Sequence, residues 1–207
     1  MALIDSLTTF RVSVAEANSF TTLAFQQDAA GNYMLSQNQR EFITDSAYLR
    51  LFIAWETFLE NSFIKYMLGE PSILGNVITR YVQPLNERHA NSLLIGTQKY
   101  VDWSNPEIIK RLCNLYFSPG NPFDTYVSSI FADLFDLKTI RNAAAHLTSS
   151  TRQQLDSLGT RKLQRPCNNL KVSDLIFAVD PNSTNNETIL TTYLDKLDIS
   201  AEGIANG

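Results

Sequence analysis

The chain has 207 residues, of which 44% are hydrophobic and 11% aromatic, and its mean hydropathy is −0.13. This composition supplies enough apolar surface for a folded core, so it excludes a disordered chain, a collagen-like repeat and a disulfide-stabilised miniprotein. The net charge of −4 argues against a protein that coats long stretches of nucleic acid, because phosphate binding needs clustered Lys and Arg.

Helical periodicity begins near the N-terminus. Residues 3–28 place apolar side chains at helical spacing, and the sequence at 29–32 favours a stop. Residues 37–68 give the strongest helical pattern in the chain, because an aromatic and apolar stripe recurs at i, i+4 and i+7. A helix of that length extends about 48 Å, and Gly69 marks its end.

Shorter helices are predicted for the middle of the chain. Residues 72–116 fit two or three of them, with breaks around Pro84 and Pro106. A loop rich in Pro and Gly follows at 118–122. Helical spacing then resumes and continues towards His146.

A capping pattern marks the start of the next helix. Ser150 and Gln153 match a capping box, which places the helix start just beyond His146 and its end near Gly159. Residues 160–171 are basic and are expected to form a loop.

The last elements are a short apolar piece at 174–179, a turn at 181–186 and a closing helix at 188–197. The chain shows no internal repeat, no low-complexity linker and no convincing strand alternation. The sequence therefore predicts an all-α bundle that forms a single domain over residues 1–207.

Several features bear on the compartment. No stretch approaches the roughly 18 continuous apolar residues of a membrane span, and the N-terminus lacks a basic region followed by an apolar run. Cys113 and Cys167 lie 54 positions apart without a CxxC pattern, which favours structural thiols over a disulfide or a zinc site. We expect a cytoplasmic protein with no membrane contact.

Positive charge is concentrated in one segment. Residues 138–173 contain seven basic residues and a single acidic one, whereas the chain on either side is acidic. A local positive island on an acidic body suits a confined anionic ligand. A solvated basic loop with no ligand would give the same composition.

Side chains that could take part in catalysis lie inside this island, in the sequence RNAAAH at 141–146. On a helix Asn142 and His146 share one face, whereas Arg141 lies about 140° round from His146. The guanidinium must therefore curl over the helix end or meet a group from another chain. The three alanines leave room for a packed helix or a ligand.

These residue types fit RNA cleavage without a metal ion. Histidine exchanges protons near neutral pH, a guanidinium pairs with phosphate, and Asn142 can orient the imidazole or donate to a phosphate oxygen. The sequence has no HxH, CxxC, DxD or ExxE cluster for a metal-dependent nuclease. A structural role for Arg141 and His146, at a helix cap or on the surface, remains the alternative.

Two stretches resemble the HEPN superfamily. The run LKTIRNAAAHLTSS at 137–150 is similar to its R-x4-to-6-H signature, and LRLFIAWETFLEN at 49–61 is similar to a long Trp-Glu helix of its RiboL-PSP-HEPN-like branch. The order of elements downstream is similar too, and the likeness covers roughly residues 37–200, although 70–120 matches little.

The resemblance implies a bundle of four to five helices with one long central helix, which dimerises so that two motifs face each other. It also implies a metal-independent, cofactor-free endoribonuclease that leaves a 2′,3′-cyclic phosphate and a 5′-hydroxyl. Arg141 would hold the phosphate, His146 would act as acid or base, and Asn142 would orient. Such proteins serve as toxins with an antitoxin partner or as phage-defence effectors.

One further expectation and two competing hypotheses complete the sequence analysis. The charge island suggests that Arg152, Arg161 and Lys162 contact the RNA backbone. The competing hypotheses are a non-catalytic HEPN module that binds nucleotide, RNA or a protein partner, and an all-α interaction protein with an accidental motif.

Overall fold

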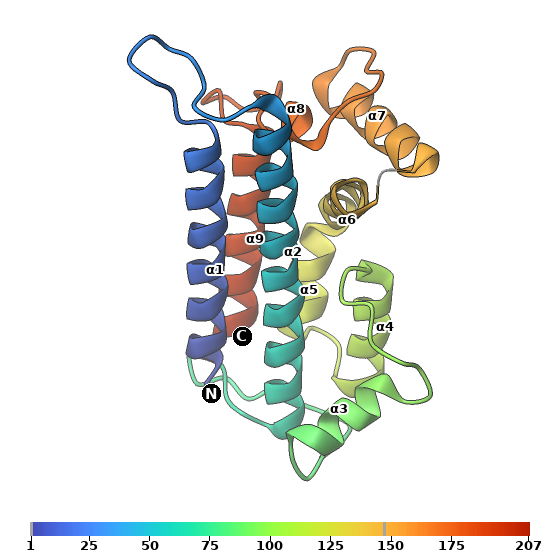
Figure 1. Ribbon diagram of the computed structural model, residues 1–207. Coiled ribbons are helices and arrows are strands. Elements are labelled where there is room, and N and C mark those ends of the chain that lie inside the picture. The colour runs from blue at the N-terminus through green and yellow to red at the C-terminus, as the bar shows by residue number, and fades with distance from the viewer. Residues whose placement is uncertain (1, 147) are drawn as a thin grey trace. The chain divides into compact units, whose positions relative to one another are not determined.

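The computed structural model describes residues 2–146 and 148–207 (Figure 1). Within these residues the regular structure consists of nine α-helices without any β-strand, which confirms the all-α class. The helices are α1 (Leu3–Ala24), α2 (Gln37–Leu68), α3 (Glu87–Ile95), α4 (Pro106–Tyr116), α5 (Pro122–Ser129), α6 (Phe131–Ala145), α7 (Ser149–Leu163), α8 (Val172–Ile176) and α9 (Ile189–Asn206). None of these helices is long and apolar enough to cross a membrane.

The chain divides into two compact units. The first contains the residues up to Arg11, Ala54–Phe135 and Lys196–Gly207, and the second contains Val12–Ile53 and Asp136–Asp195. The unit boundaries lie inside α1, α2, α6 and α9 rather than in loops. The single-domain organisation over the whole chain stays a prediction.

Aromatic side chains fill the core of the first unit. The Phe63 ring lies 4.8 Å from that of Phe117 and 5.0 Å from that of Phe123, measured between centroids. The buried Tyr66 hydroxyl donates to the Ile204 carbonyl oxygen at 2.6 Å, which joins α2 to α9 within this unit. The apolar stripe predicted along residues 37–68 therefore packs as a core, as its spacing indicates.

The second unit is organised around a buried carboxylate. Asp136 on α6 is only 6% exposed. It accepts from the Tyr193 hydroxyl of α9 at 3.0 Å, from the Lys162 ammonium of α7 at 3.1 Å and from the Arg161 guanidinium. Because a buried charge is stable only when paired and hydrogen-bonded, these contacts fix α6 against α7 and α9 in this unit.

The start of α7 differs from the prediction. Thr148, not Ser150, is the N-cap: its hydroxyl accepts from the Thr151 N–H at 3.2 Å, and the Thr151 hydroxyl accepts from the Thr148 N–H at 3.1 Å. Two hydroxyl residues compete for this role, and the one that precedes the first helical residue takes it.

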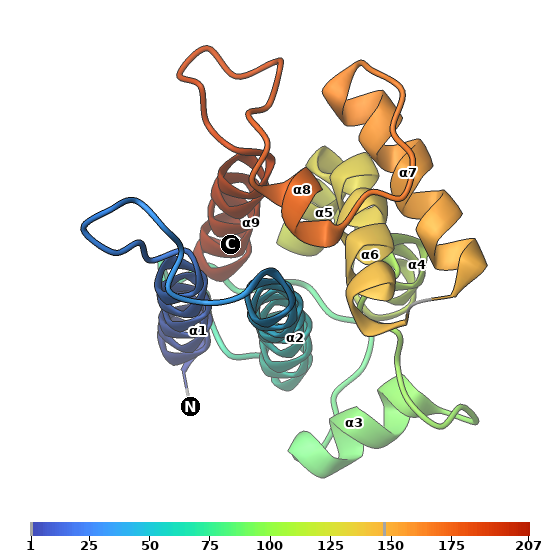
Figure 2. The same cartoon turned by 45° about the horizontal axis from the view of Figure 1, so that its top comes forward.

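The predicted end of α7 at Gly159 is also wrong, because the helix continues to Leu163. A Cβ atom on Gly159 would lie 2.3 Å from a methyl carbon of Leu170 and 3.4 Å from the Cys167 sulfur. The glycine therefore admits the returning chain, shown following α7 in Figure 2, instead of ending the helix. Part of the loop expected at 160–171 is consequently helical.

The end of α2 agrees with the prediction and has a defined geometry. The Gly69 N–H donates to the Tyr66 carbonyl and the Glu70 N–H donates to the Lys65 carbonyl, both at 3.0 Å, which is the Schellman arrangement. Gly69 has φ of +85°, a left-handed conformation that glycine adopts without penalty.

Substitution of Gly69 tests this helix end. A Cβ there would lie 1.7 Å from the Arg80 guanidinium, so Gly69→Ala adds displacement of that group to a left-handed backbone cost of about 1–2 kcal/mol. Gly75→Ala is the matched control, because Gly75 has the same φ and nothing within 4 Å. We expect Gly69→Ala to lower the free energy of unfolding more than Gly75→Ala in urea denaturation. Equal losses would show that Arg80 moves aside at no cost.

Candidate functional site

The RNAAAH sequence forms the end of α6 in the second unit. Arg141 and Asn142 lie in its final turn, and His146 is the first residue beyond the helix. The His146 N–H donates to the Asn142 carbonyl oxygen at 3.0 Å. This bond continues the backbone pattern of α6 to His146, while the shared face of the Asn142 and His146 side chains stays a prediction.

Arg141 is held by its neighbour. Its Nη1 donates to the side-chain oxygen of Asn142 at 3.3 Å, and both residues are half-buried. Asn142 thus contacts the guanidinium in the described chain, although the sequence suggested that it orients the imidazole. A guanidinium carries five N–H donors, so this contact leaves donors that can meet a phosphate.

The backbone of His146 is anchored while the residue stays exposed. Its carbonyl oxygen accepts a short hydrogen bond from the Thr151 hydroxyl, the same hydroxyl that accepts from the Thr148 N–H. The cap of α7 therefore holds the turn that follows α6, and the imidazole is accessible to solvent and ligands.

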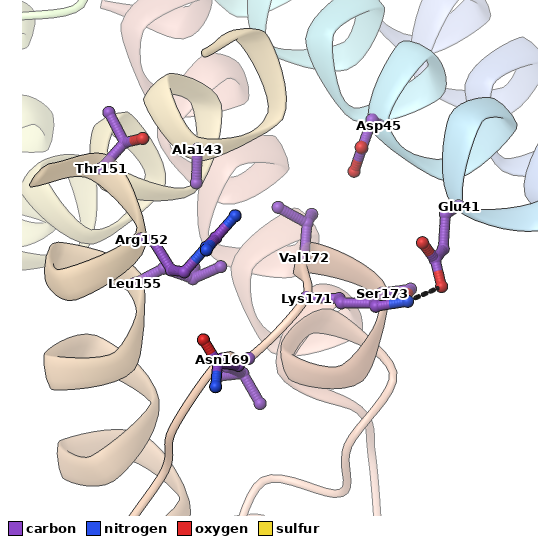
Figure 3. Close-up of a pocket in the computed structure, with 11 residues that line it drawn as sticks. Glu41, Asp45, Ala143, Thr151, Arg152, Leu155, Asn169, Lys171, Val172 and Ser173 are labelled. Carbon is purple, nitrogen blue, oxygen red and sulfur yellow. Dashed lines mark hydrogen bonds and ion pairs between the residues drawn. The ribbon is translucent and has the colours of Figure 1, made fainter. Parts of the chain in front are cut away.

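A cavity of about 410 Å³ lies within the second unit, and the end of α6 lines part of it. Of the RNAAAH sequence only Ala143, which is 5% exposed, lines it. Its walls come from α2, α6, α7, the chain before α8 and α8 itself (Figure 3). The lining residues are Glu41, Asp45, Ala143, Thr151, Arg152, Leu155, Asn169, Leu170, Lys171, Val172 and Ser173.

The acidic residues of the cavity differ in their partners. Glu41 forms an ion pair with Lys171, and this hydrogen bond lowers the pKa of the Glu41 carboxyl. Asp45 makes no hydrogen bond or ion pair within the described chain, and burial, together with the nearby Glu41 charge, raises its pKa to about 6. Desolvation of an unpaired carboxylate favours its neutral form.

The basic residues predicted to contact RNA are distributed over two places. Arg152 is exposed and lines the cavity, and its guanidinium has no partner in the part of the chain that the structure covers. Arg161 and Lys162 both pair with Asp136. The Lys162 side chain is only 18% exposed, whereas that of Arg161 is 59% exposed. Their contact with RNA stays a prediction.

The remaining histidine and the two cysteines lie outside the RNAAAH turn and do not line the cavity. His89 is exposed, and its Nδ1 accepts from the Leu85 N–H at 3.2 Å at the start of α3. Cys113 and Cys167 are free thiols, and burial raises the pKa of Cys113 to about 12. In residues 2–146 and 148–207, no group of three or more His, Cys, Asp or Glu side chains is placed to hold a metal ion.

Sequence reasoning located the RNAAAH turn and Arg152, but it missed Glu41, Asp45 and the rest of the cavity. Glu41 and Asp45 are separated from Arg152 by more than 100 positions, so no local spacing relates them. The one signal available was that Glu41 and Asp45 lie four residues apart and share a face of the predicted long helix.

Comparison with protein-family models, curated proteins and solved structures finds no match for this chain. The HEPN resemblance therefore rests on the two stretches that carry it, and the function is argued from the geometry of the site.

Replacement of Asp45 tests the electrostatics of the cavity, which Asp45 lines together with Glu41, Lys171 and Arg152. Its pKa in the folded protein, about 6, exceeds the ordinary value of 3.8, so the folded state binds the proton more tightly than the unfolded chain. Asp45 therefore lowers stability above about pH 6, and this cost disappears below about pH 4.

We expect Asp45→Asn to raise the free energy of unfolding by about 1–3 kcal/mol at pH 8 and to leave it nearly unchanged at pH 4. Urea denaturation at both pH values measures the difference. Asp195→Asn, at an exposed position of the same unit, is the control. A gain of the same size at both pH values would contradict the desolvated carboxylate.

Proposed function

We propose that this protein is a metal-independent endoribonuclease whose active site contains Arg141, Asn142 and His146. One observation carries the proposal: at the end of α6 a guanidinium is held by Asn142 beside an exposed histidine whose backbone is fixed by the cap of α7. A phosphate-binding cation and a proton-transfer group on one short, anchored turn are the parts that such cleavage needs.

The chemistry follows from these two groups. A neutral imidazole removes the proton of the ribose 2′-hydroxyl, and the 2′-oxygen attacks the adjacent phosphorus. The bond from phosphorus to the 5′-oxygen breaks, which leaves a 2′,3′-cyclic phosphate and a 5′-hydroxyl that receives a proton from an imidazolium. Arg141 stabilises the charge that develops on the phosphoryl oxygens.

A second copy of the chain completes this site. The reaction needs a base for the 2′-hydroxyl and an acid for the 5′-oxygen, and one copy brings a single histidine to the turn. Two turns related by a twofold axis supply two imidazoles and two guanidiniums, and a symmetric interface pairs the same turn on both subunits. A homodimer with a composite site satisfies both needs.

The biological setting that fits is a cytoplasmic toxin or phage-defence effector, held in check by an antitoxin or another protein partner. The alternative is a non-catalytic HEPN-type module that binds nucleotide, RNA or a protein. The cavity beside Ala143 favours nucleotide binding as part of either function, because its volume is in the range of small-ligand sites.

Single substitutions in EDTA test the catalytic proposal. We expect His146→Ala and Arg141→Ala to reduce cleavage of bulk RNA by at least about 100-fold, the contribution typical of a general acid–base group. His89→Ala is the matched control, because His89 caps a local turn in the other unit. Equal RNA decay with all variants would mean that a contaminant degrades the RNA.

Mixing two inactive variants tests the composite site. In a heterodimer of Arg141→Ala and His146→Ala chains, the composite site keeps one intact Arg141 and one intact His146, which come from different chains. We expect the mixture to regain part of the wild-type rate after subunit exchange, while each variant alone stays inactive. A mixture as inactive as its components, in a preparation shown by sedimentation to contain dimers, would contradict a site shared between chains.

A further inference from the structure

The cavity beside the catalytic turn holds two ionic groups of opposite sign that do not neutralise each other. Figure 3 shows the Asp45 carboxylate and the Arg152 guanidinium extending into it from α2 and α7, respectively. Neither group has a hydrogen-bond or ion-pair partner among the residues that the structure describes. Asp45 is half-buried, so its carboxylate has lost part of its hydration without gaining a partner, whereas Arg152 is exposed. A ligand that pairs the carboxylate stabilises it, and the guanidinium is available to the same occupant.

The remaining charges of the cavity restrict what the occupant can be. Lys171 is paired with Glu41 across the opening, so these two charges cancel locally. A simple anion would meet the Asp45 carboxylate, and a simple cation would meet Arg152. The occupant must therefore present N–H donors along one edge and acceptor atoms along another.

Part of the cavity wall is apolar. This part is formed by the side chains of Ala143, Leu155, Leu170 and Val172, while Thr151, Asn169 and Ser173 add uncharged polar groups. Such walls suit the flat faces of an uncharged ring, since ligand sites commonly combine apolar surfaces with a few polar groups that set orientation. The volume of about 410 Å³ accommodates a ring system together with a sugar.

Guanine has this distribution of groups. Its N1–H and N2 amino group form a donor edge that suits a carboxylate, and its O6 and N7 form an acceptor edge that an arginine contacts in bidentate fashion. Adenine presents an amino group at the position of O6 and an acceptor at N1, which would meet Arg152 and Asp45 with the wrong polarity. Pyrimidines have no five-membered ring and so lack the N7 acceptor that pairs with O6 in guanine.

We propose that this cavity binds a guanine base of the RNA substrate, with Asp45 accepting from its N1 and N2 groups and Arg152 donating to O6 and N7. The inference rests on the proposed function, because Ala143, which lines the cavity, belongs to the same turn as Arg141 and His146. A base in the cavity therefore belongs to a nucleotide near the scissile phosphate, and the nuclease prefers RNA with guanine at that position.

Calorimetric titration of the inactive His146→Ala protein tests base recognition without cleavage. We expect GMP to bind at least ten times more tightly than AMP, and Asp45→Asn in the same background to abolish this preference. Asp195→Asn and Arg165→Gln, which change exposed residues of the same unit, should leave both affinities unchanged. Equal affinity for GMP and AMP, or an unchanged preference in Asp45→Asn, overturns the proposal.

A modified base isolates the arginine contact. The 7-deaza analogue of GMP lacks the N7 acceptor, so we expect it to bind several-fold more weakly than GMP when Arg152 is present. In Arg152→Gln the two ligands should bind alike, and thermal melts of each variant establish that it is folded. A 7-deaza penalty that persists in Arg152→Gln overturns the assignment of Arg152.

Short single-stranded RNAs test whether the bound guanine belongs to an RNA chain or to a free nucleotide. They also distinguish failure of the base site from failure of the nuclease proposal. We expect an oligonucleotide with one guanine to displace GMP and to bind more tightly than its adenine counterpart. If GMP binds but the guanine oligonucleotide fails to compete, assignment of the base to an RNA substrate is overturned. Guanine binding without any RNA cleavage by the wild-type protein would overturn the nuclease and not the base site.

Discussion

The Thr151 hydroxyl takes part both in the cap of α7 and in the turn between α6 and α7. It accepts from the Thr148 N–H at 3.1 Å and donates to the carbonyl oxygen of His146. The reciprocal N-cap contact, in which the Thr148 hydroxyl accepts from the Thr151 N–H, contributes roughly 1 kcal/mol of helix stability. The Thr151 hydroxyl also fixes the backbone of the candidate proton-transfer residue. The exposed imidazole and one wall of the cavity both depend on it, since Thr151 lines the cavity as well.

Ion pairs with distant acidic residues use much of the positive charge of residues 138–173. Counting along the sequence gives residues 138–173 a strong excess of Lys and Arg. In the fold, Arg161 and Lys162 neutralise Asp136, and Lys171 neutralises Glu41. Much of the excess therefore stabilises the second unit. Arg141 at the turn and Arg152 in the cavity form no ion pair among the described residues, so a confined ligand fits the structure better than a broad nucleic-acid surface.

The helices could be predicted wherever the controlling interactions are local. The bounds 37–68 match α2, and Gly69 ends it through its own left-handed backbone. The prediction failed at α7, where contact with Leu170 overrides the helix-stopping tendency of Gly159. It also stopped the last helix at residue 197, whereas α9 reaches Asn206 because Ala201, Ile204 and Ala205 are fully buried. Burial against distant segments leaves little trace in a short window of sequence.

The candidate site also contains a part that local sequence predicts and a part that only the tertiary fold assembles. The turn from Arg141 to His146 is contiguous, so its residues and their spacing were visible in the sequence. The cavity combines Asp45 with Arg152 and with the chain before α8, and only the tertiary fold brings these together.

Asp45 is the residue of the cavity whose presence most needs an explanation. A carboxylate whose pKa is raised by burial and by a neighbouring acid costs stability, and an uncharged side chain of similar size would avoid that cost. Such unfavourable groups concentrate at functional sites, where a ligand supplies the missing partner. The guanidinium of Arg152, which lines the same cavity and has no partner among the described residues, is available to such a ligand.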